Sequence, residues 1–378
     1  MENRWKQVKL EDILNFRRGH DLSKKNMSGD NYPVVGSNGI IGYHNEFIKK
    51  SPCVTIGRSG NIGTPYYYNQ DCWPHNTTLY IDDFKGNDEK YIFYLLKKLD
   101  FKRYAGGSAV PTLNRNHIHP IDVFVTLDVN EQKAIAKVLS DLDEKIETNN
   151  KINRKLEEMA QAIFKQWFVD FEFPNEDGKP YKSSGGEMVE SELGMIPKGW
   201  RQSTLEEVAI MSAGGDKPKC FSKNATEDYD VPIYSNGIDN EGLYGYTDKA
   251  KIFEEAITVS ARGTIGYVCL RQQPYFPIVR LISLVPHKSI ITSKYLYFYL
   301  KLINISGTGT TQQQLTVPDF KRTKICIPKY QVIKQFTDMV NDIFRKIEVG
   351  KNENMKLAEL RDTLLPKLMS GEIRVSID

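Results

Sequence analysis

The sequence predicts an α+β protein in which two tandem α/β lobes are separated by a long antiparallel two-helix coiled coil, with a pseudo-two-fold repeat. Three observations predict this fold: a series of segments that occurs twice, a long heptad pattern after each series, and a polar linker between them. A chain of 378 residues is also too long for one ordinary hydrophobic core and suits two domains.

The repeat consists of six pairs of matching segments that follow one another in the same order in both halves. It opens with WKQVKLEDI from Trp5 and WRQSTLEEV from Trp200. YPVVGSNGIIGY (32–43) then matches VPIYSNGIDNEGLYGY (231–246), and the Asn-Gly pair in each predicts a hairpin turn because both residues tolerate a positive φ. An alternative is two unrelated α+β domains that share common turns, but matches in one order favour a tandem duplication.

The later segments complete each lobe. VTIGRSGNIGT (54–64) matches ITVSARGTIGY (257–267), and each predicts a strand followed by a turn that carries an arginine. We expect short aromatic helices at 89–99 and 293–303, polar glycine-rich tracts at 106–118 and 307–320, and a final strand in IDVFV and KICIP. Each lobe therefore begins near its tryptophan, Trp5 or Trp200, and ends with this strand. The segment 174–196 is rich in Pro, Gly, Ser and charge, which predicts a surface linker.

A heptad pattern follows each lobe and predicts one long helix from about 130 to 168 and another from about 331 to 370. Its apolar seam residues recur in alternating steps of four and three, the spacing of a coiled coil. They include Ile135, Leu139, Leu142, Ile146 and Leu156 in the first helix, and Phe336, Val340, Ile343, Ile347 and Leu357 in the second. The alternative is that each helix belongs to the core of its own lobe. Polar seam residues such as Asn149, Asn153 and Asn354 favour pairing of the two helices, which would place the lobes at opposite ends of a rod.

Bulk composition excludes several classes of protein. The net charge of +3 permits a nucleic-acid partner without requiring one, so local clusters of positive charge matter more. Five cysteines without a CxxC pair argue against a zinc site and a disulfide framework, and fit a reducing cytosol. The sequence has no apolar signal segment and no run long enough to cross a bilayer, so we expect a cytoplasmic protein without a membrane partner.

Motifs for catalysis and cofactor binding are missing from the sequence. It contains no GxxxxGK[ST] phosphate loop, no GxGxxG after a strand, no HExxH and no GxSxG. The six histidines do not fall at metal-ligand spacing, and Asp141, Asp143 and Glu144 are interpreted as a solvated helix face. We therefore expect no catalytic residue, no metal and no cofactor on this chain.

The lobes instead offer donor side chains on turns, of the types that neutralise phosphates and read base edges. In the first lobe these candidate DNA-binding residues are Arg17, Arg18, Lys24, Lys25, Asn38, Arg58, Ser59, Asn61, Thr64, Asn76, Arg103, Ser108, Asn114 and Arg115. In the second lobe they are Lys217, Lys219, Asn236, Arg262, Thr264, Arg280, Thr308, Thr310, Thr311, Gln312, Gln313, Lys321 and Arg322.

These groups differ in how strongly they indicate DNA contact. Asn38 and Asn236 lie in matching Asn-Gly turns, where a turn-forming role is favoured over base contact. Arg58 and Arg262 lie beside glycines at matching positions, where DNA contact and a structural role are equally open. The polar tracts 108–115 and 308–314 are expected to be exposed, which favours DNA contact.

Three segments point to a family: LEEMAQAIFKQWFVDFEFP (156–174), the linker GKPYKSSGGEMVESELGMIPKGW (178–200) and the ending LRDTLLPKLMSGEIRV (360–375). With these segments and the opening tryptophan of each lobe, the sequence resembles the specificity (S) subunit of type I restriction–modification enzymes over essentially its whole length.

The resemblance implies that each lobe is a target recognition domain that reads one half of a bipartite double-stranded DNA sequence. It also implies that the paired helices set the spacer and bind two methyltransferase (M) subunits, to which two restriction (R) subunits can be added. S-adenosylmethionine, ATP and Mg²⁺ would be bound by those partners, and the chain itself would be non-catalytic. Target recognition domains vary greatly in this family, so base-reading residues are not transferred.

Two other functions are compatible with the residues alone. A two-lobed protein-interaction adaptor would bind no specific DNA sequence, whereas a stand-alone nuclease would cut DNA without partners. The missing carboxylate–lysine and metal signatures argue against the nuclease.

Overall fold

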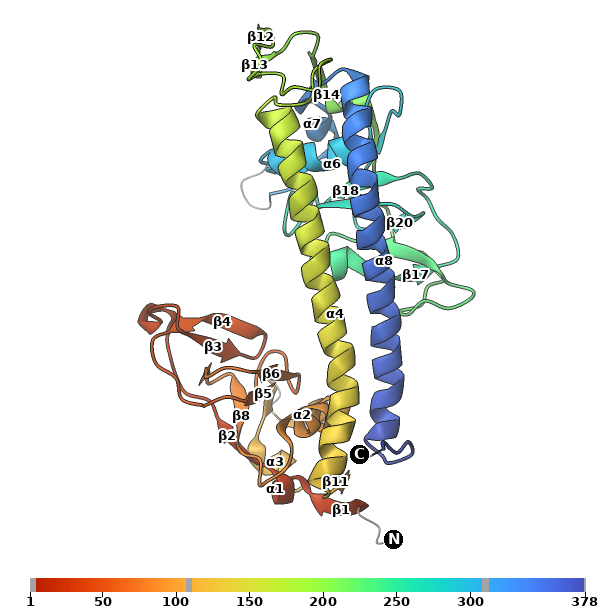
Figure 1. The fold of residues 1–378 in the computed structure, drawn as a ribbon. Coiled ribbons are helices and arrows are strands. Elements are labelled where there is room, and N and C mark those ends of the chain that lie inside the picture. The colour runs from red at the N-terminus through yellow and green to blue at the C-terminus, as the bar shows by residue number, and fades with distance from the viewer. Residues whose placement is uncertain (1–4, 107–110, 308–312, 377–378) are drawn as a thin grey trace. The chain divides into compact units, whose positions relative to one another are not determined.

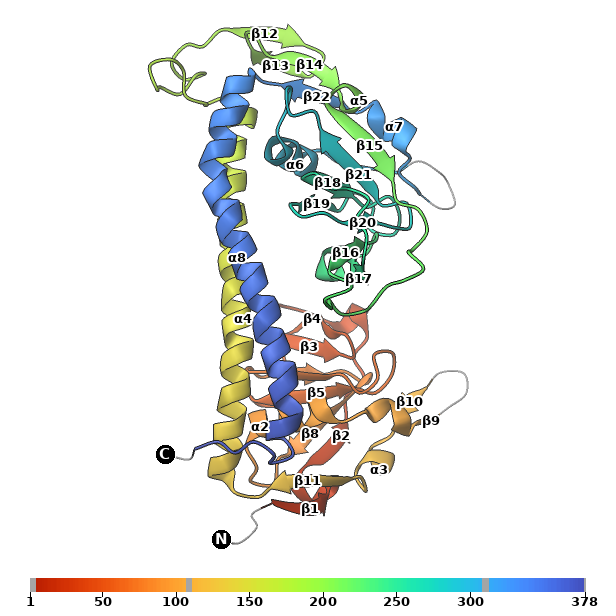
Figure 2. The ribbon, with the colours of Figure 1, turned by 90° about the vertical axis from the view of Figure 1, so that its right-hand side faces the viewer.

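The computed structural model describes residues 5–106, 111–307 and 313–376, which form two compact units. Unit 1 comprises Met1–Lys151 with Gly350–Asp378, and unit 2 comprises Ile152–Val349. Each unit holds one lobe and a part of both long helices, α4 (Val129–Phe164) and α8 (Tyr330–Leu368). Within each unit, α4 and α8 lie side by side and run in opposite directions (Figures 1 and 2).

The first lobe contains a four-stranded and a three-stranded sheet. Its elements are β1 (Trp5–Lys9), α1 (Leu10–Ile13), β2 (Asn15–Arg18), η1 (Lys24–Asn26), β3 (Tyr32–Gly36), β4 (Gly39–His44), β5 (Cys53–Gly57), β6 (Pro65–Tyr68), β7 (Trp73–Pro74), β8 (Thr78–Asp83), α2 (Glu89–Lys98), η2 (Phe101–Tyr104), β9 (Ala105–Gly106), β10 (Thr112–Leu113), α3 (Arg115–Ile118) and β11 (Asp122–Thr126). The sheet orders are β2-β8-β5-β6 and β4-β3-β7, while β1 pairs with β11 and β9 with β10. Strand β3 runs antiparallel to β4 and parallel to β7.

The second lobe repeats the main sheets of this topology. Its elements are β14 (Arg201–Thr204), α5 (Leu205–Val208), β15 (Ala209–Ala213), β16 (Val231–Tyr234), η4 (Asp239–Gly242), β17 (Leu243–Thr247), β18 (Ala256–Val259), β19 (Val268–Arg271), β20 (Phe276–Pro277), β21 (Ile282–Pro286), α6 (Ser293–Leu302), α7 (Val317–Lys321) and β22 (Lys324–Ile327). The sheet orders are β15-β21-β18-β19, β17-β16-β20 and β14-β22, and β16 runs parallel to β20 as β3 does to β7. The predicted pseudo-two-fold repeat is therefore confirmed at the level of strand order.

The aromatic helices α2 and α6 form where the sequence predicts them. Each begins at a residue whose side chain accepts a hydrogen bond from a backbone N–H in the first turn: Asp88 accepts from Tyr91, and Thr292 from Tyr295. Their buried faces combine aromatic with aliphatic side chains, and each helix packs between the strands of its lobe and the long helices. In unit 2, α6 contacts β18, β19 and β21 on one side.

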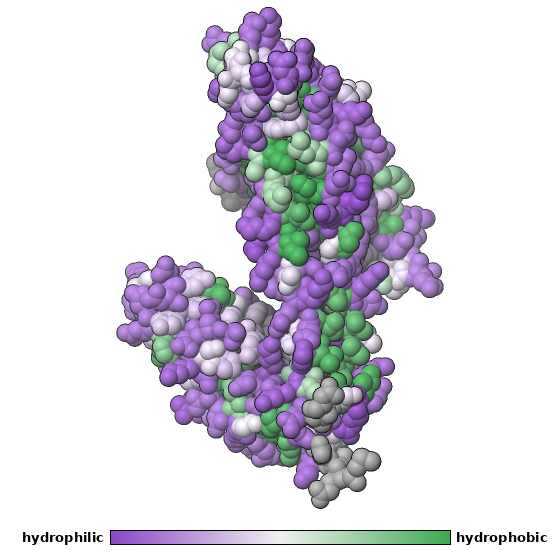
Figure 3. Space-filling view, viewed as in Figure 1, coloured by the Kyte–Doolittle hydropathy of each residue, from purple (hydrophilic) through white to green (hydrophobic). Residues whose placement is uncertain are grey.

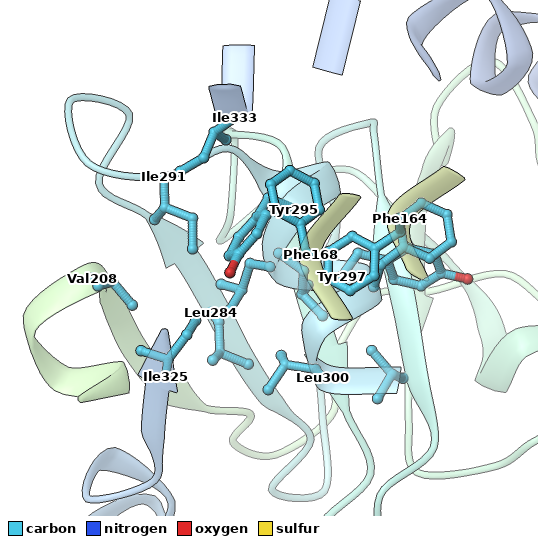
Figure 4. Packing of buried hydrophobic residues seen from close by; sticks show 14 of the residues in the cluster. Phe164, Phe168, Val208, Leu284, Ile291, Tyr295, Tyr297, Leu300, Ile325 and Ile333 are labelled. Carbon is cyan, nitrogen blue, oxygen red and sulfur yellow. The ribbon is translucent and has the colours of Figure 1, made fainter. Parts of the chain in front are cut away.

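On its other side, α6 packs against α4 and α8 through a cluster of aromatic rings (Figure 4). The ring of Phe164 lies 5.5 Å from that of Tyr295 and 5.7 Å from that of Phe336. Phe168 is closer still, at 4.8 Å from Tyr295 and 5.1 Å from Phe336. Large buried rings contribute most of the area that such a core removes from water, so this cluster joins lobe and helices in unit 2.

The segment after α4 is more ordered than a surface linker. The helix continues as a π-helical turn, η3 (Lys165–Val169), and the predicted linker contains a hairpin of β12 (Met188–Ser191) and β13 (Gly194–Pro197). Phe173 packs between two rings, at 4.6 Å from Tyr181 and 5.1 Å from Trp200. The polar composition that predicted a surface linker gave no indication of this hairpin or of these aromatic contacts.

Two expectations from composition need correction. Cys53 and Cys72 form a disulfide although no CxxC pair is present, because the sheet topology brings β5 close to the start of β7. Asp143 does not lie on a purely solvated helix face, since it pairs with Arg361 of α8 and accepts a hydrogen bond from Tyr94. In the part of the chain that the structure describes, no helix is long and apolar enough to span a membrane.

Candidate nucleic-acid interface

The first lobe contains a cavity of about 450 Å³ that is lined by positively charged side chains. Its lining brings together five residues predicted to bind DNA: Arg17, Arg18, Arg58, Asn114 and Arg115. Guanidinium groups bind phosphate oxygens and the acceptor edge of guanine with paired hydrogen bonds. Four of them around one cavity form a surface suited to DNA.

Strand β2 presents two of these arginines at its end. The Arg17 guanidinium lies 3.0 Å from the Asp82 carboxylate of β8, which orients it, and Arg18 is more than half exposed. Tyr80 lines the same cavity. Burial, assisted by the negative charge of Asp82, raises the pKa of Tyr80, so its hydroxyl is protonated at neutral pH and can donate a hydrogen bond.

The other arginines of this cavity lie on two turns that contact each other. The backbone N–H of Arg58 donates to the carbonyl of Thr77 at 2.8 Å, and its own carbonyl accepts from the N–H of Leu113 at 2.8 Å. Arg115 begins the short helix α3, which Asn114 caps with its side chain. Asn114 therefore has a structural role beside its place in the cavity wall.

The second lobe has a cavity of about 680 Å³, lined by the predicted residues Lys217, Arg262 and Arg280. As in the first lobe, the lining includes the end of the first strand of the four-stranded sheet, here β15, and the turn after β18, the counterpart of β5. Arg262 Nη2 donates to Gln314 Oε1 at 3.0 Å. The two lobes thus place cationic cavities at corresponding positions of the repeat.

The remaining candidates of the first lobe do not line its cavity. Asn61 accepts a hydrogen bond from Thr64 at 2.8 Å and donates to Tyr66 at 3.3 Å, which stabilises its own turn. Arg103 pairs with Asp100 at 2.8 Å, and Asn76 donates to Asp21. Exposed or partly exposed on the surface are Lys24, Lys25, Asn38 and Ser59.

The remaining candidates of the second lobe are similarly divided. Lys321 pairs with Glu206 at 2.8 Å, and both polar ends of the Asn236 side chain bond to backbone groups. Exposed on the surface are Lys219, Thr264, Gln313 and Arg322. Ser108, Thr308, Thr310, Thr311 and Gln312 lie outside the described residues.

Several cavity residues were not predicted. They are His20, Leu79, Tyr80, Thr112, Leu113 and Asn116 in the first lobe, and Ala213, Gly214, Gly215, Asp216, Tyr244, Ile278 and Val279 in the second. Tyr244 directly precedes the Gly-Tyr ending that both lobes share, but the first lobe has Ile41 at that position, so the repeat did not indicate it. Val279 carries no signal in the sequence, because an apolar residue on a cavity wall is recognised only from the fold.

The predicted seam residues of the helices divide between the two units. In unit 1, Ile135 and Leu139 are buried in the core of the lobe, and Leu142, Ile146 and Leu357 are partly exposed. In unit 2, Phe336, Val340 and Ile347 are buried, while Leu156 and Ile343 pack against them. The seam residues of α4 and α8 therefore pack both against the lobe of their unit and against the other long helix.

Polar seam residues meet across α4 and α8 in unit 1. Asn149 Nδ2 donates to Asn354 Oδ1 at 2.9 Å and to Glu353 Oε2 at 2.7 Å, and Asn354 Nδ2 donates to Asn150 at 2.8 Å. Asn149 is 5% exposed. Because a buried amide that loses its partner is costly, this contact favours one register of the two helices.

Comparison with known proteins places these features in a family. A family model described as the type I restriction modification DNA specificity domain matches residues 2–158 and, a second time, residues 197–359. The chain belongs to this family. It is a specificity subunit of a type I restriction–modification system, the non-catalytic subunit that recognises the DNA target.

Related specificity subunits span most of the chain. The MjaIX specificity subunit of Methanocaldococcus jannaschii is 29% identical over 77% of this chain and 70% of its own length. The HindI specificity subunit of Haemophilus influenzae is 27% identical over 65% of this chain and 68% of its own length. A crystal structure of the S subunit from M. genitalium shares the fold, with a TM-score of 0.59, 18% identity and 96% coverage of both chains.

Recognition of DNA agrees with the residues on the surface of this specificity subunit. Among the described residues, no group of His, Cys, Asp and Glu side chains could hold a metal ion. The cavities bring together arginine and lysine side chains, with Arg17, Arg18, Arg58 and Arg115 in the first and Lys217, Arg262 and Arg280 in the second. Such cations bind phosphates and read base edges.

Proposed function

We propose that each lobe reads one half of a bipartite DNA target and does so at its cation-lined cavity. The observation that carries this proposal is the corresponding placement of the two cavities in the repeat, each with an arginine on the turn after β5 or β18. On this assignment, residues 1–129 and 197–329 are the target recognition domains, 130–173 and 330–378 the spacer helices, and 174–196 the segment between them.

We also propose that α4 and α8 bind the methyltransferase subunits. Apolar side chains are exposed on both helices: Ile152 and Met159 on α4, and Met339, Val349, Met355 and Leu360 on α8. Figure 3 shows apolar residues at the surface along the helices. Apolar side chains that gather on a surface mark a site for a protein partner more often than scattered ones do.

In the proposed complex, the chain is in the cytoplasm and binds two methyltransferase subunits. A complete restriction enzyme also contains two restriction subunits. S-adenosylmethionine, ATP and Mg²⁺ would be bound by these partners. The two lobes recognise the DNA sequence, and the partner subunits catalyse the reactions on the DNA.

The proposal is tested by selecting bound duplexes from a random-sequence library with the full-length protein and its methyltransferase subunits. We expect two short conserved sequences separated by a gap of fixed length, and binding that weakens steeply as salt rises. A single continuous motif, or no enrichment, would overturn the assignment of one half-site to each lobe.

A further inference from the structure

Asn236 links the two turns that carry the arginines of the second cavity. Its side-chain Oδ1 accepts a hydrogen bond from the backbone N–H of Ala261 at 2.8 Å, and its Nδ2 donates to the carbonyl of Val279 at 2.5 Å. Ala261 directly precedes Arg262, and Val279 directly precedes Arg280. One amide therefore bonds to both arginine-bearing turns, with its oxygen to the first and with an N–H group to the second.

The second of these turns needs such support because its backbone is strained. Val279 and Arg280 have φ angles of 52° and 61°, in the left-handed region that a β-branched valine rarely adopts. Their N–H groups donate to the carbonyls of Gly215 and Gly214, both at 2.8 Å. Strained non-glycine residues persist only where surrounding contacts fix them, and the Asn236 amide supplies the contact to the Val279 carbonyl.

The first lobe uses the matching asparagine differently. Asn38 is exposed, and its side chain makes no hydrogen bond to any other residue that the structure describes. The connection is made there by Thr77, whose hydroxyl accepts from the N–H of Ser37 at 3.3 Å and whose carbonyl accepts from the N–H of Arg58 at 2.8 Å. The asparagine of the same Ser-Asn-Gly sequence thus bonds to the arginine-bearing turns in the second lobe, whereas in the first lobe its side chain is exposed.

We propose that Asn236 is a positioning residue for recognition of the second half-site. It fixes Arg262 and Arg280 relative to each other, so that both guanidinium groups face the same short stretch of DNA, and it does not contact DNA itself. This inference rests on the proposed function in one respect, because it takes the cavity of the second lobe to be a DNA-binding site.

The substitution Asn236→Asp tests the idea because it preserves size and changes one group. The carboxylate keeps the acceptor for Ala261 but places a second acceptor against the Val279 carbonyl, where the amide had a donor. With the full-length complex and the random duplex library, we expect the sequence preference of one half-site to be lost and affinity to fall about tenfold, the effect of losing one well-formed arginine–base contact. The preference of the other half-site should be unchanged.

Removing the two arginines distinguishes a positioning role of Asn236 from a general loss of structure in the Asn236 variant. In a chain that already carries Arg262→Ala and Arg280→Ala, Asn236→Asp should cause no further loss of affinity. The matched control is Asn38→Asp, which should leave the melting temperature unchanged because that side chain has no internal hydrogen bond. If Asn236→Asp fails to fold, Asn236→Ala, which adds no charge, carries the same prediction.

Three outcomes have distinct meanings. An equal loss with and without the arginines, or in both half-sites, would show that Asn236 has only a structural role and would overturn the proposal. A switch to a different preferred base, with the arginine-dependent preferences intact, would show that residue 236 contacts that base directly and would also overturn it. If the wild-type protein yields no two-part motif, the proposed function fails instead, before any variant is compared.

Discussion

Asp143 lies on α4 where three elements of unit 1 meet. Its carboxylate is 2.6 Å from the guanidinium of Arg361 on α8, 2.7 Å from the hydroxyl of Tyr94 and 3.4 Å from the ammonium of Lys97 on α2. Burial alone would raise the pKa of Asp143, but hydrogen bonds from Arg361 and Tyr94 and the nearby positive charges outweigh it, so the pKa is lowered. The ionised carboxylate therefore stabilises the folded state.

Replacing this carboxylate gives a prediction that depends on pH. The neutral amide of an Asp143→Asn variant cannot pair ionically with Arg361, so the free energy of unfolding at pH 7 should fall by about 2 kcal/mol. An aspartate whose pKa is lowered on folding loses its contribution as the pH falls through that pKa. The difference between wild type and variant, followed by urea unfolding, should shrink below the ordinary pKa of 3.8.

The matched control for this prediction is Asp141→Asn on the same helix. Asp141 pairs with exposed Lys137, one turn away, so its replacement should change stability little. A stability loss for Asp143→Asn that is the same at every pH would show that the ion pair is not its cause.

Arginines on corresponding turns should have separate effects on recognition. Arg262→Ala should weaken the sequence preference of one half-site by about 1–3 kcal/mol, the usual value of a bidentate arginine–guanine contact. Arg58→Ala should do the same for the other half-site. The measurement is the enriched sequence from a random duplex library. Equal losses in both half-sites for either variant would show that the lobes are not independent readers.

The roles of single residues could be predicted from the sequence only in part. The pattern located Arg58 and Arg262 on turns, because glycines and β-branched strands around them are local signals, whereas Arg17, also expected on a turn, lies on strand β2. It could not distinguish the roles of Asn38 and Asn236, which lie in the same Ser-Asn-Gly sequence. Their difference arises from Thr77 and Val279, which are distant in the chain and reach the turns only through the fold.

At the scale of secondary-structure elements, the seam of α4 and α8 serves two purposes. The sequence presented helix pairing and packing on a lobe as alternatives, since periodicity reports only that one face is apolar. In unit 2, Phe336 is fully buried against both Phe164 of α4 and Phe298 of α6. The positions and lengths of helices were predictable from local pattern, whereas the partner of each apolar face was not.

The burial of individual seam residues predicts how sensitive each is to charge. Ile347 is 7% exposed, so Ile347→Asp should lower the free energy of unfolding by about 4 kcal/mol or more and release the partner subunits. Leu142 is partly exposed, and Leu142→Asp should cost clearly less. Urea unfolding and co-purification of the methyltransferase subunits measure the two effects. If both variants lose the same stability, burial in the seam does not determine its strength.

At the scale of the whole molecule, the duplication was predictable because it preserves turn chemistry and strand order. The matching sheets β2-β8-β5-β6 and β15-β21-β18-β19 bear this out. The ordered hairpin within the polar segment 174–196 was not predictable from composition, since Phe173, Tyr181 and Trp200 are isolated aromatic residues in the sequence and form a stack only after folding.

The proposed function assigns the distance between the two DNA-reading lobes to the two paired helices. Inserting one heptad into α4 and one into α8, at the paired Asn149 and Asn354, adds about 10 Å to each helix and preserves the seam. At about 3.4 Å per base pair, this corresponds to about three base pairs. Mapping of methylated sites made by the complex measures the outcome. The account predicts the same two half-sites with a gap about three base pairs longer, and an unchanged gap in a folded, active complex would contradict it.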